Sequence, residues 1–375
     1  MIYADNAATT QMSRAAIDAM VFHMENIWGN PSSLYEFGQK AQEAITSARE
    51  KIAKCINAAP AEIYFTSGGS EADNQAIISA AKVGAKKNKK HIISTAFEHH
   101  AVLHTLKKLE AEGFEIELLD VHSNGLINPA QVEKAIRPDT CFVTIMFANN
   151  EIGTIQPVKE LCKIAHDNGA LFHTDAVQAV GHIPIDVKNL GVDMLSASAH
   201  KFNAPKGIGF LYIRKGVKIS PLIDGGSQEF GFRAGTENIA GIVGMAEALK
   251  NNCDSLEKNQ LHIKQLENLL LDNLNKSKIS YVKNGGQNTL PGLISLSFEN
   301  QNGETILHRL DLMRICISTG AACNGTSTKI SHVLQAINLT ENLAKGTVRI
   351  SLGKYNITDD VVAIANAIKK LNFNK

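Results

Sequence analysis

The sequence predicts an α/β protein: a large domain with a mostly parallel sheet flanked by helices, joined to a smaller α+β domain. Short β-branched runs alternate with longer amphipathic segments through the middle of the 375-residue chain. Such alternation is typical of parallel strands with helices on both faces of the sheet. After Gly235 the alternation ends in a nearly unbroken run of helix formers. At about 150 residues per domain, the length also predicts two or three domains.

The large domain contains six predicted strands, at residues 62–66, 91–95, 115–119, 141–147, 171–174 and 193–196. Amphipathic segments that predict helices lie between most of them, at residues 71–86, 101–112 and 158–168. Ligands of such sheets bind at the carboxyl ends of the strands. Residues that directly follow these strands are therefore the first candidates for a functional site.

Residues 236–276 predict a long helix or a helix pair that bridges to a second domain. Three strands, at residues 293–298, 315–318 and 347–352, and a final helix at residues 358–371 follow. This mixture predicts the smaller α+β domain.

Charge and composition exclude several classes of partner. Lysine plus arginine number 38 against 37 aspartate plus glutamate, a formal charge of +1, so no basic excess exists to neutralise a nucleic-acid backbone. No signal peptide or long apolar segment is present, which predicts a cytoplasmic protein without a membrane partner. In that reducing compartment the six cysteines should be free thiols. None of them has C-x-x-C spacing, so neither disulfides nor a metal site is expected.

A turn of small residues, 67–70 (SGGS), connects a predicted strand to a predicted helix. Glycines such as Gly69 let backbone N–H groups approach an anion, while the helix N-terminus adds its dipole and Ser70 a hydroxyl. The turn predicts a phosphate cradle, and an ordinary turn with Ser70 as the N-cap is an equal alternative. Neither the dinucleotide fingerprint nor the P-loop pattern occurs, which disfavours a nucleotide.

A carboxylate and a lysine follow two further apolar strands, as Asp175 and Lys201. A lysine is a poor choice for a buried strand end unless an amine is needed there. Pyridoxal phosphate requires a lysine for its Schiff base, an aspartate for its pyridine nitrogen and a cradle for its phosphate. Separately, an exposed turn acid and a snorkelling surface lysine are good alternatives. Together, at the ends of three strands of one sheet, the groups favour pyridoxal phosphate.

Three other segments carry polar groups that suit the same pocket. An imidazole from His99 or His100 could stack on a flat cofactor and move protons, and the spacing does not choose between them. The amides of residues 149–150 could hydrogen-bond the ring or form an ordinary turn. Arg349, within an apolar strand, could bind a substrate carboxylate through two hydrogen bonds, or lie on the solvent face of an edge strand.

One cysteine differs from the others. Cys323 lies among small and polar residues, 318–328 (STGAACNGTST), which predict an accessible loop and offer no apolar pocket. A thiol there has little packing value, so a nucleophile is favoured. Packing or surface thiols are predicted for the remaining cysteines, Cys55, Cys141, Cys162, Cys253 and Cys316.

In combination, these segments resemble the NifS/IscS-type cysteine desulfurases, pyridoxal-phosphate enzymes of fold type I related to the class V aminotransferases. The shared motifs run nearly end to end, at residues 5–10 (DNAATT), 29–33 (GNPSS), 66–71 (TSGGSE), 149–153 (NNEIG), 200–201 (HK), 233–236 (RAGT) and 331–334 (SHVL). The segment STGAAC is similar to the active-site loop of the NifS/IscS branch. We therefore assign residues 14–255 to the large, cofactor-binding domain, and residues 1–13 and 256–375 to the small domain that carries the cysteine loop.

The resemblance implies conversion of L-cysteine to L-alanine, with the sulfur moving to Cys323 as a persulfide. Lys201 would form the Schiff base and move protons, and His99, favoured over His100 by the family's Glu-His pair, would stack on the ring and move the thiol protons. The implied cofactor-binding set is Gly69, Ser70, His99, Asn150, Asp175, Gln178, Ser198, His200, Lys201 and, from the neighbouring subunit of a homodimer, Thr236. The implied substrate-carboxylate set is Asn30, Asn150 and Arg349.

The implied partner is a sulfur-acceptor protein, either an iron–sulfur scaffold or a thiolation protein, so the sulfur would serve iron–sulfur cluster assembly or tRNA thiolation. Two alternatives stay open. One is a pyridoxal-phosphate-dependent selenocysteine lyase or small-amino-acid aminotransferase in which Cys323 is incidental. The other is a non-catalytic sulfur-assembly scaffold.

Overall fold

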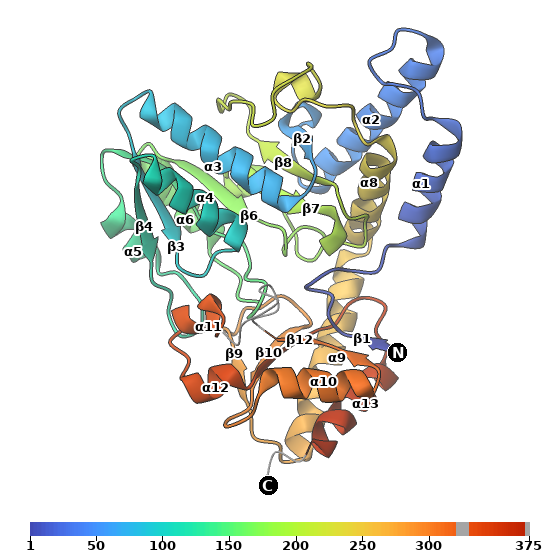
Figure 1. Cartoon of the computed structure of the whole chain (residues 1–375), viewed down its shortest axis with the longest axis vertical. Coiled ribbons are helices and arrows are strands. Elements are labelled where there is room, and N and C mark those ends of the chain that lie inside the picture. Colours follow the sequence, from blue (N-terminus) through green and yellow to red (C-terminus); the bar gives the residue numbers. More distant parts are fainter. Residues whose placement is uncertain (320–329, 372–375) are drawn as a thin grey trace.

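The computed structural model describes residues 1–319 and 330–371. It shows a larger body stacked on a smaller one (Figure 1). The larger body is built on strands β2 (Ile63–Thr66), β3 (His91–Thr95), β4 (Glu115–Leu119), β5 (Thr140–Thr144), β6 (Leu171–Asp175), β7 (Met194–Ser198) and β8 (Gly209–Ile213). They form one seven-stranded sheet in the order β2-β8-β7-β6-β5-β3-β4.

Five neighbouring strands of this sheet, β7, β6, β5, β3 and β4, run parallel. Only β8 runs antiparallel to its neighbours β7 and β2. The predicted mostly parallel sheet is confirmed. The sequence did not predict β8, because a short apolar run without alternation is ambiguous between a strand and a buried helix segment. The carboxyl ends of β3, β5, β6 and β7 meet at one edge.

Helices cover both faces of the large sheet. They are α1 (Arg14–Asn26), α2 (Glu36–Cys55), α3 (Gly69–Ala85), α4 (His100–Ala111), α5 (Pro129–Ala135), α6 (Val158–Asp167), α7 (Val187–Leu190) and α8 (Ile239–Asp254). Two clusters of buried apolar side chains pack these helices against the sheet. One joins α3 and α4 to Ile92 and Phe142, and the other joins α2, α6 and α8 to the adjacent residues Ile93 and Val143. Successive strand residues thus serve opposite faces, as the alternation of side chains requires.

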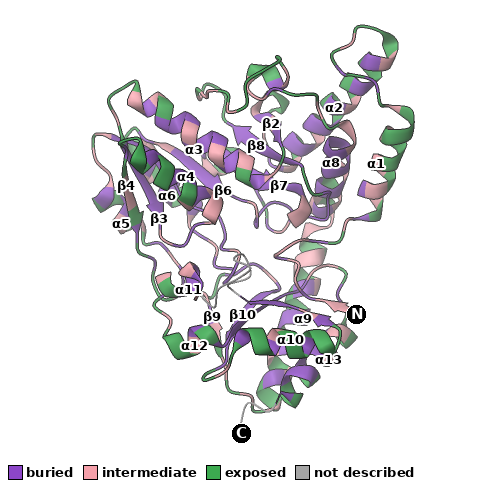
Figure 2. Cartoon of the chain, viewed as in Figure 1, coloured by how far each residue is buried: buried purple, intermediate pink, exposed green. Residues whose placement is uncertain are grey.

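Burial follows this layering. The central strands of the large sheet are buried along their length, whereas the outward sides of the helices are exposed (Figure 2). Each fully buried large apolar side chain, such as Phe142 or Phe172, contributes about 1.5–3 kcal/mol relative to exposure. The rigid sheet edge that results carries the residues of the candidate site.

The smaller body has its own sheet and core. Strands β9 (Val282–Asn284), β10 (Leu293–Ser297), β12 (Ser318–Thr319) and β13 (Thr347–Ser351) form an antiparallel sheet in the order β12-β13-β10-β9. The helices of the smaller body are α9 (Leu256–Lys276), α10 (Gly303–Leu312), α11 (His332–Ala336), α12 (Glu341–Lys345) and α13 (Thr358–Lys370). Residues of α9 and α13 pack with β10 and β13 in a separate apolar cluster. The predicted smaller α+β domain is therefore present.

Two predicted elements differ in detail. The long helical segment is a pair, α8 and α9, separated at Ser255. The predicted strand 315–318 is wrong as a single element. It divides into β11 (Ile315–Cys316), which pairs with β1 (Ile2–Tyr3), and β12, which pairs with β13. Neighbouring residues join different sheets because the start of the chain occupies a position beside β11.

The N-terminal segment is held against β13 near the end of the chain. The Ser351 N–H donates to Ala4 O at 2.7 Å, and Asn6 Nδ2 donates to Ser351 O at 2.9 Å. The first residues of the chain therefore reach the junction of the two bodies. None of the helices in residues 1–319 and 330–371 combines the length and apolar character needed to cross a membrane.

Candidate active site

A cavity of about 1330 Å³ lies at the carboxyl edge of the large sheet, and both bodies line it. Ten of the sequence-predicted site residues line it: Gly69, Ser70, His99, Asn150, Asp175, Gln178, Ser198, His200, Lys201 and Arg349. Asn30 and Thr236 are not in its lining, and both are exposed in the single chain. Cys323 lies outside the described residues.

The predicted phosphate cradle is the N-terminus of α3. Gly68, at φ 155°, is the N-cap and the helix begins at Gly69, so the alternative with Ser70 as N-cap is wrong. A Cβ on Gly69 would lie 2.6 Å from Val177 Cγ2, so this turn requires glycine. The first N–H groups of a helix have no intrahelical acceptor, and Ser198 and His200 also line the cavity. This arrangement fits a phosphate group.

Asp175 ends β6 at the base of the cavity and is 5% exposed. Its Oδ1 accepts the Val177 N–H at 2.9 Å. Burial raises the pKa of the Asp175 carboxyl, while His99, that hydrogen bond and Lys201 act to lower it. An exposed turn acid is therefore the wrong interpretation. A buried carboxylate that accepts a backbone N–H and faces the Lys201 amine is suited to pair with a protonated ring nitrogen.

Lys201 lies in the short turn η2 (Ala199–Lys201) that follows β7. Its Nζ donates to Ala7 O at 2.6 Å and to Ala8 O at 2.8 Å, so the snorkelling surface lysine is also the wrong interpretation. The amide of Gln178 donates to the same Ala7 O at 2.9 Å. The N-terminal segment thus forms the wall that holds the amine at the cavity.

His200, next to this lysine, is a hydrogen-bonding group at neutral pH. Burial first, then Lys201 and Lys206, lower the pKa of its imidazole to about 4. Its Nδ1 lies 3.1 Å from Thr9 Oγ1. A neutral imidazole can still hydrogen-bond a phosphate oxygen.

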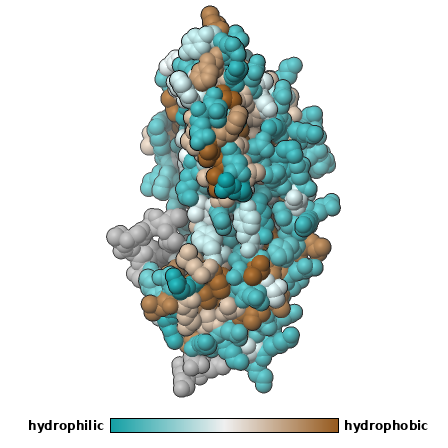
Figure 3. All heavy atoms as spheres, turned by 90° about the vertical axis from the view of Figure 1, so that its right-hand side faces the viewer, coloured by the Kyte–Doolittle hydropathy of each residue, from teal (hydrophilic) through white to brown (hydrophobic). Residues whose placement is uncertain are grey.

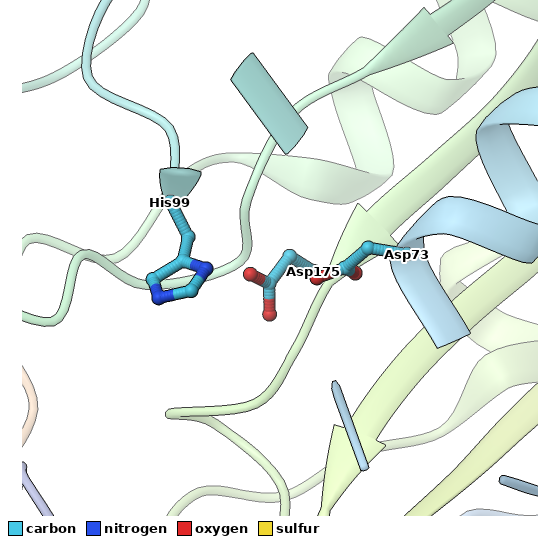
Figure 4. A group of neighbouring side chains, drawn as sticks. All are labelled: Asp73, His99 and Asp175. Carbon is cyan, nitrogen blue, oxygen red and sulfur yellow. The ribbon is translucent and has the colours of Figure 1, made fainter. Parts of the chain in front are cut away.

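The structure distinguishes the two adjacent histidines. His99 is the N-cap of α4, where its Nδ1 accepts the Ala101 N–H at 3.1 Å. The proton of the neutral ring is therefore on Nε2. A ring nitrogen of His99 lies within 4.8 Å of Asp175 (Figure 4). His100 instead packs its ring on His104 and His332, with centroids 5.1 and 4.6 Å away.

Residues flanking these positions have structural roles. Glu98 is fully buried and accepts the Thr95 hydroxyl at 2.6 Å and the Met146 N–H at 2.9 Å. Burial raises the pKa of its carboxyl to about 8, so it is largely protonated at neutral pH. Asn149 forms the turn, because its Oδ1 accepts the N–H groups of Glu151 and Ile152. Turn chemistry thus applies to Asn149, while its neighbour Asn150 lines the cavity.

Arg349 enters the cavity from β13, which is an inner strand. Its Nη1 donates to Asn150 O at 3.0 Å and its Nη2 to Asp5 Oδ1 at 2.9 Å. The residue is 6% exposed, so the edge-strand alternative is wrong. Within the described residues, the buried Nε has no hydrogen-bond partner, which leaves this guanidinium with donor capacity for an anion.

Two acids of the site escaped the sequence analysis. Asp5 pairs with Arg349, and Asp73 lies beside Asp175 (Figure 4). The available signal for Asp73 was its spacing: it lies four residues after Gly69, hence on the same side of the helix. The cysteines at 55, 141, 162, 253 and 316 are free thiols.

Comparison with known proteins gives consistent matches. The family described as Aminotransferase class-V matches residues 2–364. The chain is 47% identical over 371 residues to the cysteine desulfurase IscS of Dictyoglomus turgidum, with 99% of this chain and 94% of that protein covered. A solved NifS-like protein superposes with a TM-score of 0.93 at 38% identity, covering 99% and 98% of the two chains. A structure of SspA in complex with cysteine gives 0.84 at 38% identity, covering 95% and 100%.

Proposed function

The chain belongs to the class-V aminotransferase family, and we infer that it is a pyridoxal-phosphate-dependent cysteine desulfurase, a transferase that converts L-cysteine to L-alanine. The observation that carries this function is the convergence of Lys201, Asp175 and the N-terminus of α3 on one cavity. The similarity to cysteine desulfurases over nearly the whole chain supports the same conclusion.

We propose that different residues around the cavity bind different parts of the cofactor. The N-terminus of α3, with Ser198 and His200, would hold the phosphate. Asp175 would face the pyridine nitrogen, and Gln178 the phenolic oxygen. His99 would lie on the ring face, and the Lys201 amine would be the point of covalent attachment. When bound, pyridoxal phosphate supplies an electron sink that stabilises negative charge at the substrate Cα.

The substrate steps would be performed by three side chains. Arg349 would bind the carboxylate of L-cysteine, with Asn150 beside it. Lys201 would take the Cα proton. Cys323, as a thiolate, would then attack the substrate sulfur. In that step an S–S bond to Cys323 forms and the substrate C–S bond breaks, and protonation of the remaining carbon skeleton gives alanine.

We expect the sulfur to be found on Cys323. After incubation of the loaded enzyme with L-cysteine, mass spectrometry of the peptide that contains Cys323 should show one added sulfur, removable by a thiol reductant. No lysine or arginine separates Cys316 from Cys323, so fragmentation of their shared peptide must place the sulfur on Cys323, and the peptide that contains Cys162 is the control that should stay unmodified. Alanine formation accompanied by sulfur on another cysteine, or on none, would contradict the assignment.

Substitution of Arg349 should weaken substrate binding selectively. Arg349→Lys removes the planar fork but keeps the charge, so we expect KM for L-cysteine to rise about 10- to 100-fold, with kcat changed less. Initial rates over a range of L-cysteine concentrations measure both constants. Arg137→Lys, a change at an arginine paired with Glu115 and Asp139 outside the cavity, is the matched control. An unchanged KM in Arg349→Lys would remove this residue from substrate binding.

We propose that the protein is a homodimer. Large apolar side chains are exposed on α1 and on the segment that follows it: Val21, Phe22, Met24, Trp28, Leu34 and Tyr35. Figure 3 looks onto the side of the molecule that carries α1, and apolar side chains appear along its upper half. Exposed apolar surface of this kind is typical of an interface. In a dimer the exposed Thr236 would be free to reach the partner's phosphate site.

Light scattering should give twice the chain mass of 40.6 kDa. The pair Phe22→Glu and Trp28→Glu should shift the protein towards the monomer, because a charge at the centre of an apolar contact is costly. Leu312→Glu, at a position 85% exposed in the smaller body, should leave the mass unchanged. A wild-type protein that is monomeric at micromolar concentration would overturn the proposal.

We further propose a cytoplasmic enzyme that passes its persulfide to an acceptor protein, an iron–sulfur scaffold or a thiolation protein. The free thiols support a reducing location, and the net charge of +1 gives no reason to propose direct nucleic-acid binding. Radiolabelled sulfur from L-cysteine should move from the enzyme to such a protein on mixing. Sulfur that leaves only as free sulfide in the presence of both acceptor classes would argue against protein-to-protein transfer.

A further inference from the structure

A second carboxyl group lies directly behind the one assigned to the cofactor. Asp73, on α3, is 1% exposed, and Asp175, at the end of β6, is 5% exposed. A carboxylate oxygen of each and a ring nitrogen of His99 lie within 4.8 Å of one another. Figure 4 shows Asp175 between the other two side chains. The steps described for the substrate do not use Asp73.

On the side away from the cavity, the described neighbours of Asp73 are neutral groups. Behind it, His173 is fully buried, with its Nδ1 2.8 Å from Thr144 Oγ1 and its Nε2 2.9 Å from Ser196 Oγ. Burial lowers the pKa of His173 to about 3, so this ring is neutral. It lies 3.7 Å from Asp73 Oδ1, which has no hydrogen-bond partner within residues 1–319 and 330–371.

Asp175 has the opposite surroundings. It accepts the Val177 N–H, and His99 and Lys201 face it from the cavity side. Two carboxyl groups so close together and away from water do not both ionise. The negative charge belongs on the group that accepts a backbone N–H and faces the Lys201 amine, which is Asp175. Burial, then Asp175, raise the pKa of Asp73; Ser196 lowers it and the more distant Glu98 raises it.

We propose that Asp73 is a positioning residue, a neutral carboxylic acid whose proton is directed at Asp175 and keeps that carboxylate singly charged and facing the cavity. The pyridine nitrogen would then meet one negative charge from Asp175, with the polar chain Asp73-Ser196-His173 fixed behind it. The proposal deepens the proposed function, because it takes Asp175 as the partner of that nitrogen.

The matched variants separate charge from shape. Asp73→Asn keeps a neutral group that can donate towards Asp175 and contact Ser196, so it copies the protonated acid. Asp73→Ala removes the donor. Neither variant reproduces the charge of an ionised Asp73. If Asp73 only fills space, neither variant should change the ionisation of neighbouring groups.

The first measurement is infrared spectroscopy of the cofactor-free protein near neutral pH. Wild type minus Asp73→Asn should contain the carbonyl band of one protonated carboxylic acid, shifted in heavy water. The difference removes the bands of the other buried acids, Glu98 and Glu151, whose pKa values burial raises to about 8 and about 7. Absence of the band overturns the proposal, and this readout is independent of the cofactor and of Cys323.

The second measurement is the pH at which the ring nitrogen of bound, nitrogen-15-labelled pyridoxal phosphate loses its proton, followed by NMR. We expect the same midpoint for wild type and Asp73→Asn. In Asp73→Ala the midpoint should rise by about one pH unit, a tenfold change in the equilibrium, because the Asp175 anion loses a donor that disperses its charge and then stabilises the protonated nitrogen more strongly. A midpoint that falls in Asp73→Asn shows that Asp73 was ionised, and an unchanged midpoint in a folded Asp73→Ala shows a structural role only. Either result overturns the proposal, and if Asp73→Ala does not fold, the Asn variant and the infrared band decide.

Discussion

Lys201→Ala should lower alanine formation from L-cysteine by about a thousandfold or more. The substitution removes both the proposed attachment point of the cofactor and the proposed base that takes the Cα proton, and loss of a positioned base alone costs about 10²- to 10⁴-fold. The Lys201 amine is held at the cavity by two backbone carbonyls, those of Ala7 and Ala8. We expect the purified variant to lack the visible absorption that borohydride bleaches in the wild-type protein.

A second lysine in the cavity lining provides a matched control. Lys345 also lines the cavity, but it is half-exposed and pairs with Glu341 on α12. Lys345→Ala should keep the borohydride-sensitive absorption and most of the activity. If the absorption survives in Lys201→Ala and disappears in Lys345→Ala, the two assignments must be exchanged.

Cys323→Ala should lower sulfide and alanine production by about a thousandfold while leaving the cofactor spectrum unchanged. The variant still has Lys201 for attachment and deprotonation. It lacks the thiolate that takes the substrate sulfur, and neutral replacements cannot act as the nucleophile. Alanine formation and the visible absorption, measured on the same preparation, separate the loss of chemistry from the loss of cofactor.

Cys316→Ala is the control for this substitution, since it removes a cysteine only seven positions earlier in the sequence and should retain activity. An aminotransferase or selenocysteine lyase with an incidental Cys323 predicts that Cys323→Ala keeps the full rate. A non-catalytic scaffold predicts no borohydride-sensitive absorption in any variant. The two measurements therefore separate all three functions.

The sequence predicted the site because one rule connects strands to ligands. Asp175, Lys201 and the turn before α3 each border a strand of a parallel sheet, and the carboxyl ends of parallel strands meet at one edge. That rule needs only the identity of the strands. It therefore placed three distant segments together, even though the ends of some strands were displaced by a few residues and β8 was missed.

The features that could not be predicted from the sequence depend on contacts between helices and strands that are distant along the chain. The resemblance already favoured His99 over His100, but only the structure shows that His99 caps α4, where its Nδ1 accepts the Ala101 N–H. Asp73 became a candidate only when α3 was seen beside β6. The pair of Asp5 with Arg349 joins residues 344 positions apart, a separation at which no local pattern operates. The proposed domain boundaries at 13 and 255 remain predictions.

The wall formed by the first residues has a consequence for biosynthesis. Ala7 and Ala8 hold the Lys201 amine, yet their segment is fixed by Asp5 to Arg349 and by Asn6 to Ser351. The N-terminal segment therefore cannot form its contacts with Arg349 and Ser351 until almost the whole protein has left the ribosome. Domains fold as units from the N-terminus during synthesis. The large sheet can therefore form before the carbonyls of Ala7 and Ala8 are fixed against the Lys201 amine. The site is completed at the end of translation, when β13, the last strand, binds the N-terminal segment.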